Sequence, residues 1–92
     1  TLQNKNINLM TPTDIRLQHF GKLQHICSEV IGVEESEIRP STNFFDDLGV
    51  SMEELAEIMA QTAQAFNIAI NKRDITEMNT LGDLLEFVEE QL

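Results

Sequence analysis

The sequence contains no tryptophan, no tyrosine and a single cysteine, Cys27. One cysteine cannot form a disulfide within the chain, and this usage is typical of a reducing compartment, so we expect a cytoplasmic protein. With five phenylalanines as its only large aromatic side chains, the chain is not expected to form a deep aromatic pocket. No apolar run approaches the roughly 20 residues that a membrane-spanning helix requires, and residues 1–10 lack the apolar segment of a secretory signal.

Positive charge is scarce as well. Six lysines and arginines stand against sixteen aspartates and glutamates, which gives a formal net charge of −10. Nucleic acids and anionic membranes are bound mainly through lysine and arginine, so we expect neither as a partner. Protein partners with basic surfaces fit this charge, although acidity that serves only solubility would give the same composition.

The histidines, the cysteine and the acidic residues are not spaced as the ligands of a metal site. His19 and His25 are six residues apart and point to different sides of one helix, and no His-x-x-x-His or Cys-x-x-Cys pattern occurs. The acidic stretch DDLGVSMEE lacks the alternating oxygen ligands of a calcium loop. Cys27 lies in an apolar stripe without a candidate base nearby. We therefore expect no metal, and we do not expect an enzyme.

Apolar side chains recur at steps of three and four residues in three segments, which predicts three long helices. The first opens at Thr11, followed by a proline and an aspartate in the first turn, and stops at Gly32. The second runs from about residue 52 to 66, and the last follows Thr80. A short helix is predicted at 72–77.

These helices predict an all-α bundle, with three long helices, one short third helix and a long loop after the first. The loop carries its own scattered apolar side chains, namely Ile38, Phe44, Phe45 and Leu48, so we expect it to be structured. We place one domain at 11–92, after a tail of residues 1–10 that we expect to be disordered. Helical periodicity predicts a core made of Phe20, Leu23, Cys27, Val30, Leu48, Leu55, Ile58, Met59, Phe66, Leu84, Leu85 and Val88.

The block FFDDLGVSMEELAEIMAQTAQAF resembles the acyl carrier protein family, whose motif is Leu-Gly-x-Asp-Ser-Leu at the start of the second helix. The residues that match the approach to this motif are Phe44, Asp46, Asp47, Leu48 and Gly49. VIGVEESEIRPSTNF resembles the family's first loop, and TLGDLLEFV resembles the start of its fourth helix. The resemblance covers about residues 15–91 without gaps.

The resemblance implies an acyl-carrier-protein-like four-helix bundle and a carrier that is not a catalyst. In that family, a phosphopantetheinyl transferase attaches 4′-phosphopantetheine from coenzyme A to the motif serine, and the arm then holds acyl groups as thioesters. The implied pathway is fatty-acid or polyketide-type biosynthesis, and the implied protein is a monomer. Its partners would be the transferase and acyl-handling enzymes, which would dock with basic residues on Asp46, Asp47, Glu53, Glu54 and Glu57.

The chain departs from the family at the motif itself, since it reads Leu-Gly-Val-Ser-Met-Glu. Without a gap, Ser51 stands at the aspartate position and Met52 at the serine position. A one-residue deletion after Gly49 would instead bring Ser51 to the serine position. Ser51 also has a sufficient structural role, because Ser51 and Glu54 form the sequence pattern of a capping box. Met52 is expected to pack as a lid over the end of the core.

Two functions therefore remain open on the sequence. In the first, Ser51 carries 4′-phosphopantetheine and the protein is an acyl carrier. In the second, Ser51 only caps a helix, and the protein is an interaction module that keeps the carrier fold and its acidic surface but has lost the attachment.

Overall fold

Each α-helix of the structure begins at a polar side chain that caps it. In all four cases the capping side chain accepts the amide of the third helical residue, whose carboxylate accepts the amide of the cap in return. The four pairs are Thr11–Asp14, Ser51–Glu54, Asn71–Asp74 and Thr80–Asp83. Such reciprocal boxes satisfy backbone donors that a helix leaves unpaired at its first turn, and they fix where each helix starts.

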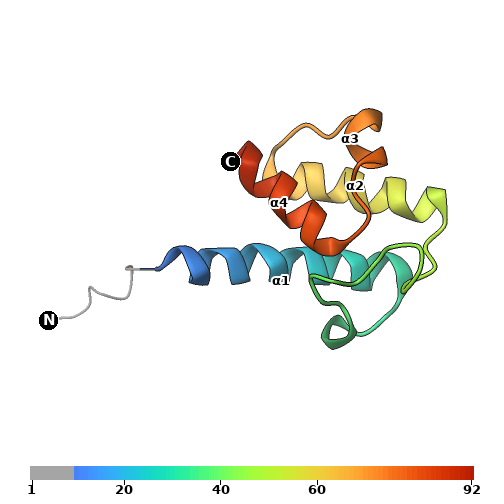
Figure 1. Cartoon of the computed structure of the whole chain (residues 1–92), viewed down its shortest axis with the longest axis horizontal. Coiled ribbons are helices and arrows are strands. Elements are labelled where there is room, and N and C mark those ends of the chain that lie inside the picture. Colours follow the sequence, from blue (N-terminus) through green and yellow to red (C-terminus); the bar gives the residue numbers. More distant parts are fainter. Residues whose placement is uncertain (1–9) are drawn as a thin grey trace, which may run out of the picture.

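The computed structural model describes residues 10–92 (Figure 1). Its elements are α1 (Pro12–Ile31), the 3₁₀ turn η2 (Glu35–Glu37), α2 (Met52–Phe66), α3 (Lys72–Thr76) and α4 (Leu81–Gln91). This confirms the predicted all-α bundle with a short third helix and a long loop after the first, and residues 10–92 contain no strand. Apart from Met10, the predicted disordered tail lies outside the described residues.

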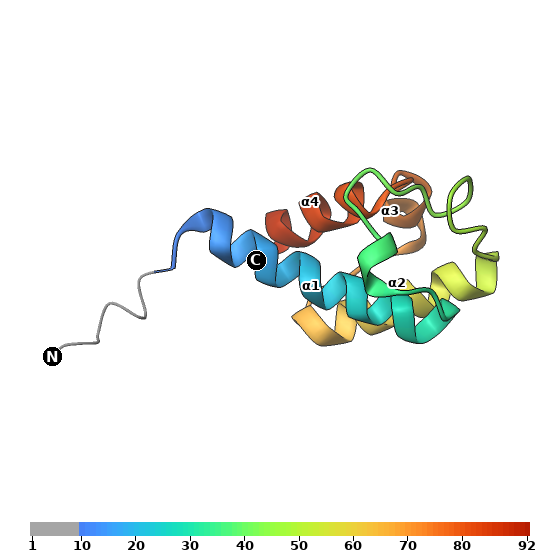
Figure 2. The same ribbon diagram turned by 90° about the horizontal axis from the view of Figure 1, so that it is seen from below.

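α1 is the longest helix, and both α2 and α4 pack against it. Two views at right angles show α4 along one side of α1 and α2 along another, with the first turns of α1 projecting beyond both (Figures 1 and 2). The long loop between α1 and α2 runs past the beginning of α4 before it reaches α2. The loop therefore connects the beginning of α4 with the start of α2.

Backbone hydrogen bonds attach this loop to the beginning of α4. The amide of Phe44 donates to the carbonyl oxygen of Asn79 at 2.9 Å, and the amide of Leu81 donates to that of Thr42 at 3.1 Å. The amide of Gly82 donates to the carbonyl oxygen of Pro40 at 2.8 Å. A Cβ atom on Gly82 would lie 2.9 Å from that same oxygen, so glycine is what allows the loop to approach α4 this closely.

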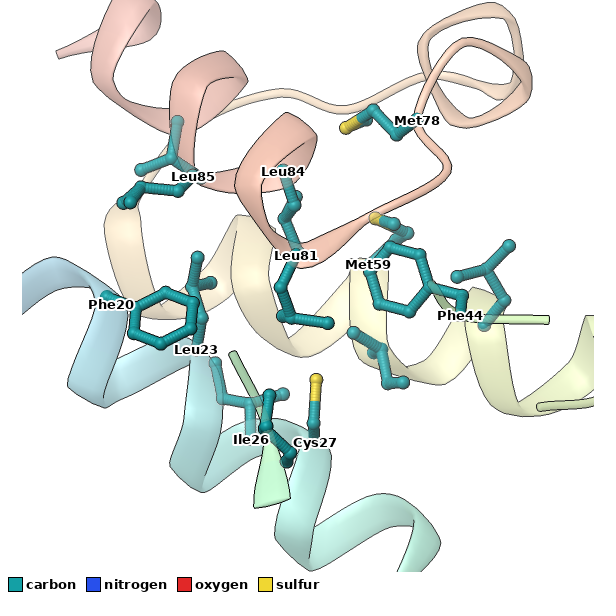
Figure 3. Packing of buried hydrophobic residues seen from close by; sticks show 14 of the residues in the cluster. Phe20, Leu23, Ile26, Cys27, Phe44, Met59, Met78, Leu81, Leu84 and Leu85 are labelled. Atoms are coloured by element: carbon teal, nitrogen blue, oxygen red, sulfur yellow. The ribbon is translucent and has the colours of Figure 1, made fainter. Parts of the chain in front are cut away.

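The core lies where the three long helices meet (Figure 3). Ten of the twelve predicted core residues are buried, whereas Val30 and Leu48 are only partly buried at its edge. The loop contributes Ile38, Phe44 and Val50 to the core, but Phe45 remains 41% exposed. The other buried apolar residues outside the predicted set are Ile26, Met78 and Leu81.

We expect Phe66→Ala to lower the free energy of unfolding by about 3–5 kcal/mol, because it empties space where α1 meets the end of α2. The ring is 9% exposed and makes an edge-on contact with His19, with ring centres 5.6 Å apart. Urea denaturation would measure the loss, with Gln64→Ala on the exposed side of the same helix as the control. A loss below about 1 kcal/mol would contradict this assignment of the core.

Acid should weaken the cap of α4. Hydrogen bonds from the amides of Asn79 and Thr80 hold the pKa of Asp83 below its ordinary value. The carboxylate therefore stabilises the fold fully above its unfolded pKa of about 3.9, and this contribution is lost as the pH falls through the lower folded pKa. Asp83→Asn should cost about 1 kcal/mol at pH 7, and less near pH 2.

Urea melts of the parent protein and of Asp83→Asn at several pH values would measure this difference. Glu86→Gln removes the same charge from the exposed face of α4 and is the matched control. A cost for Asp83→Asn that does not change between neutral and acidic pH would contradict the role of the carboxylate.

Candidate functional site

A tight turn from Asn43 to Gly49 precedes the start of α2. The side-chain oxygen of Asn43 accepts the amides of Phe45 and Asp46, both at 2.9 Å, and the carboxylate of Asp47 accepts the amide of Asn43 at 2.7 Å. Gly49 then adopts a left-handed conformation with φ of 61°, which glycine allows without strain. The next residue, Val50, is buried, so the backbone is held in place two residues before α2 begins.

Ser51 is the residue that caps α2, and its side chain is exposed. Its Oγ accepts the amide of Glu54 at 3.0 Å, and its own amide donates to the Glu54 carboxylate at 2.9 Å. The predicted capping box is therefore present. The hydroxyl lies at the positive end of the helix dipole, where a negatively charged group such as a phosphate is favoured.

Met52 is the first residue of α2, and 67% of it is exposed. The prediction that it packs as a lid over the core is wrong. The buried face of α2 begins one turn later at Leu55, and a residue in the first turn of a helix has no preceding turn to cover it. Val50 closes this end of the core in its place.

Met52 instead lies at a small apolar cavity between α2 and α3. This cavity has a volume of about 270 Å³ and is lined by Met52, Leu55, Ala56, Lys72, Ile75 and Thr76. The contribution of α3 to this cavity could not be predicted from the sequence, because its residues are about twenty positions downstream and form no recognisable motif with α2. Ser51 is not among the lining residues.

The five acidic residues predicted to bind partners lie on the turn before α2 and on its first two turns. Asp46, Asp47, Glu53 and Glu57 are exposed, whereas Glu54 is partly buried because it faces back to the cap. Glu53 and Glu57 are one helical turn apart and so share a face. Among residues 10–92, ion pairs involve Glu35 and Glu89 but none of these five.

Each of the two histidines bonds to a glutamate, and the cysteine is buried. His19 bonds to Glu89 at 3.1 Å and His25 to Glu35 at 3.0 Å, and within residues 10–92 no group of three candidate ligands could hold a metal ion. Burial raises the pKa of Cys27 to about 12, so its thiol is protonated at neutral pH and a poor nucleophile. Over the same residues, no helix combines the length and the apolar character needed to cross a membrane.

Comparison with known proteins identifies the class to which this bundle belongs. A family model described as "Phosphopantetheine attachment site" matches residues 21–88, which is more than half of the chain. The protein therefore belongs to this family of carrier proteins, the acyl carrier proteins among them. The family's prosthetic group is 4′-phosphopantetheine, and its members are carriers and not catalysts.

Curated relatives agree with this assignment. The chain is 29% identical over 77 residues to an acyl carrier protein of Thermotoga maritima, a match that covers 84% of this chain and 95% of the relative. It is 33% identical over 67 residues to the meromycolate extension acyl carrier proteins of Mycolicibacterium aurum and Mycolicibacterium smegmatis. Those two matches cover 73% of this chain and 69% and 68% of the relatives.

The residues at the start of α2 differ in their ability to hold the prosthetic group. The thioether of Met52 cannot form a phosphate ester, whereas the exposed hydroxyl of Ser51 can. A phosphodiester on Ser51 would lie at the amino end of α2, although it would also be near the carboxylate of Glu54. Ser51 therefore fits the chemistry of attachment, while Met52 occupies the first helical position.

Two substitutions at Ser51 should separate its capping role from any other role. Ser51→Ala removes the acceptor for the Glu54 amide and should cost about 1 kcal/mol. Ser51→Asp keeps an acceptor and adds a negative charge at the amino end of α2, so stability should stay close to that of the parent. Urea melts of the three proteins would measure this, and an equal loss for both variants would contradict the capping role.

Proposed function

We propose that the protein is an acyl carrier whose 4′-phosphopantetheine arm is attached to Ser51, in fatty-acid or polyketide-type biosynthesis. The arm supplies a terminal thiol on which an acyl group is held as a thioester. The observation that carries this proposal is the position of Ser51, an exposed hydroxyl at the amino end of α2 in a chain of the phosphopantetheine attachment family.

The residues around Ser51 support this role in different ways. The turn from Asn43 to Gly49 holds the approach to α2 in one conformation, so an incoming transferase would meet a preformed site. The backbone amides at the start of α2 would favour the negative charge of the phosphate. The cavity that begins at Met52 offers an apolar surface next to the attachment point.

The proposed partners are a phosphopantetheinyl transferase and acyl-handling enzymes that present basic residues to the exposed carboxylates. Asp46, Asp47, Glu53 and Glu57 are free of ion pairs within the described chain, so their charge is available to a partner. The proposal takes the protein as a monomer and as cytoplasmic, and a single free cysteine is typical of a reducing compartment.

A second candidate function is supported by the register of α2. Met52 occupies the first helical position, and the buried residues Val50 and Leu55 on either side leave little freedom to move Ser51 into its place. On this alternative, the protein is a carrier-fold interaction module without a prosthetic group. It would bind partners through the same acidic surface.

Intact-mass measurement distinguishes the two functions. The protein would be incubated with coenzyme A and a transferase of broad specificity. The carrier proposal predicts the gain of one phosphopantetheine mass, and Ser51→Ala and Ser51→Asp should both abolish it. Because Ser51→Asp keeps the cap, its failure to be modified would reflect loss of the hydroxyl and not loss of fold.

Met52→Ser is the matched control, since it places a hydroxyl at the first helical position. If Met52→Ser is modified and the parent protein is not, the carrier proposal fails and the interaction module remains. If the parent protein is modified, the double variant Ser51→Ala, Met52→Ser would show whether the transferase also accepts a serine at the first helical position.

A further inference from the structure

The capping box of α2 holds the carboxylate of Glu54 beside the hydroxyl of Ser51. One oxygen of this carboxylate accepts the Ser51 amide at 2.9 Å, and the Ser51 Oγ accepts the Glu54 amide at 3.0 Å. The nitrogen and Oγ of one serine are linked through only Cα and Cβ, so the carboxylate oxygen lies within about 7 Å of Oγ. Any group attached to Ser51 therefore starts next to a carboxylate.

Among the described residues, no ion pair neutralises this carboxylate, since the pairs that are present involve the acids Glu35 and Glu89. No lysine or arginine occurs between Arg39 and Lys72, a stretch that includes the whole of α2. Lys72 lines the cavity between α2 and α3, whereas Glu54 is not among the lining residues of that cavity. The negative charge at the cap of α2 is therefore not compensated by a salt bridge in the described chain.

Attachment of the arm would bring a second negative charge to this place. In the transfer step, the Oγ of Ser51 bonds to the phosphorus of coenzyme A that carries the pantetheine. The bond from that phosphorus to the bridging oxygen of the diphosphate breaks, adenosine 3′,5′-bisphosphate leaves, and the hydroxyl proton passes to a base of the transferase. The transferred phosphate stays anionic as a diester. Because the diphosphate is anionic before the step, repulsion from Glu54 acts in the transition state as well as in the product.

We propose, resting on the proposed attachment at Ser51, that Glu54 is a positioning residue that limits the rate of this attachment, because its carboxylate holds the Ser51 amide and repels the incoming phosphate. The amino end of α2 favours the phosphate, and Glu54 opposes that preference. Two unit charges about 7 Å apart in water repel by an energy equivalent to about a threefold change in rate. Glu54 thus acts in the opposite sense to Glu53 and Glu57, whose exposed carboxylates are proposed to attract the transferase.

Intact-mass time courses with coenzyme A and the broad-specificity transferase test this proposal. Glu54→Gln keeps the capping box, because the side-chain oxygen of glutamine can accept the Ser51 amide, but it removes the charge. We expect its kcat/KM for transfer to be about threefold or more above that of the parent protein at low ionic strength. The ratio of the two rates should approach one in about 1 M salt, where charges are screened over about 3 Å. A purely structural role of Glu54 would not produce a ratio that depends on salt in this way.

Matched variants separate the charge at the cap from the cap itself and from charge elsewhere. Glu54→Asp keeps the charge and pairs an aspartate with the cap, as the other three α-helices do, so it should restore the slower rate of the parent protein. Glu53→Gln removes the same charge one residue earlier and should slow transfer, because it weakens docking. Glu86→Gln on α4 should leave the rate unchanged. Urea melts would confirm that each variant is folded.

The inference is overturned if Glu54→Gln is modified no faster than the parent protein, if its advantage persists undiminished in about 1 M salt, or if neither protein is modified by a transferase that is active on a carrier it is known to modify. If Glu54→Gln is modified and the parent protein is not, the inference stands and the carrier function proposed for the parent protein fails. If the parent protein is modified and Glu54→Gln is no faster, the carrier function stands and the inference fails.

Discussion

The register of α2 is the constraint on which the rest of this site depends. Leu55, Ile58, Met59, Thr62 and Phe66 are buried along one face of the helix, and a shift by one residue would turn that face by about 100° away from the core. The capping box of Ser51 and Glu54 closes the helix at one end, and Asn67, in a left-handed conformation, closes it at the other. Because both ends of the helix are fixed, Met52 is its first residue and Ser51 is the residue before it.

This constraint explains why a difference of one residue at the motif matters. In a flexible loop a serine one position earlier could move to the same place, but here Val50 is buried and Leu55 is buried on the other side of the site. The side chains at 51 and 52 therefore leave the chain in different directions, the first toward solvent and the second toward the cavity between α2 and α3. Attachment at Ser51 would therefore place the start of the arm one residue before the cavity lining begins.

The sequence predicted the helices better than it predicted the residues between them. Helix ends came from local chemistry that can be read along the chain, such as Thr11 before Pro12 or Thr80 before Leu81, and the structure confirms these starts. Ile38, Phe44 and Val50 enter the core from a loop without periodicity, so no spacing rule separates them from the exposed Phe45. The burial of Met52 was wrongly predicted for a related reason. Periodicity gives the face of the helix on which Met52 lies, but it does not show that no preceding turn is there to cover its side chain. Four of the five acidic residues are exposed and Glu54 is partly buried, and their role as a docking surface stays a prediction.

The bonds that attach the loop to α4 have a consequence for local unfolding. Pro40 and Thr42 accept amides from the beginning of α4, and Phe44 donates to the residue before its cap. Loss of α4 from the bundle would therefore release the loop that orients Ser51, even though the two are far apart in sequence. Backbone amides in the loop and in the first turn of α4 should then exchange with solvent as one cooperative unit. The integrity of the site at the start of α2 is in this sense set by the last helix of the chain.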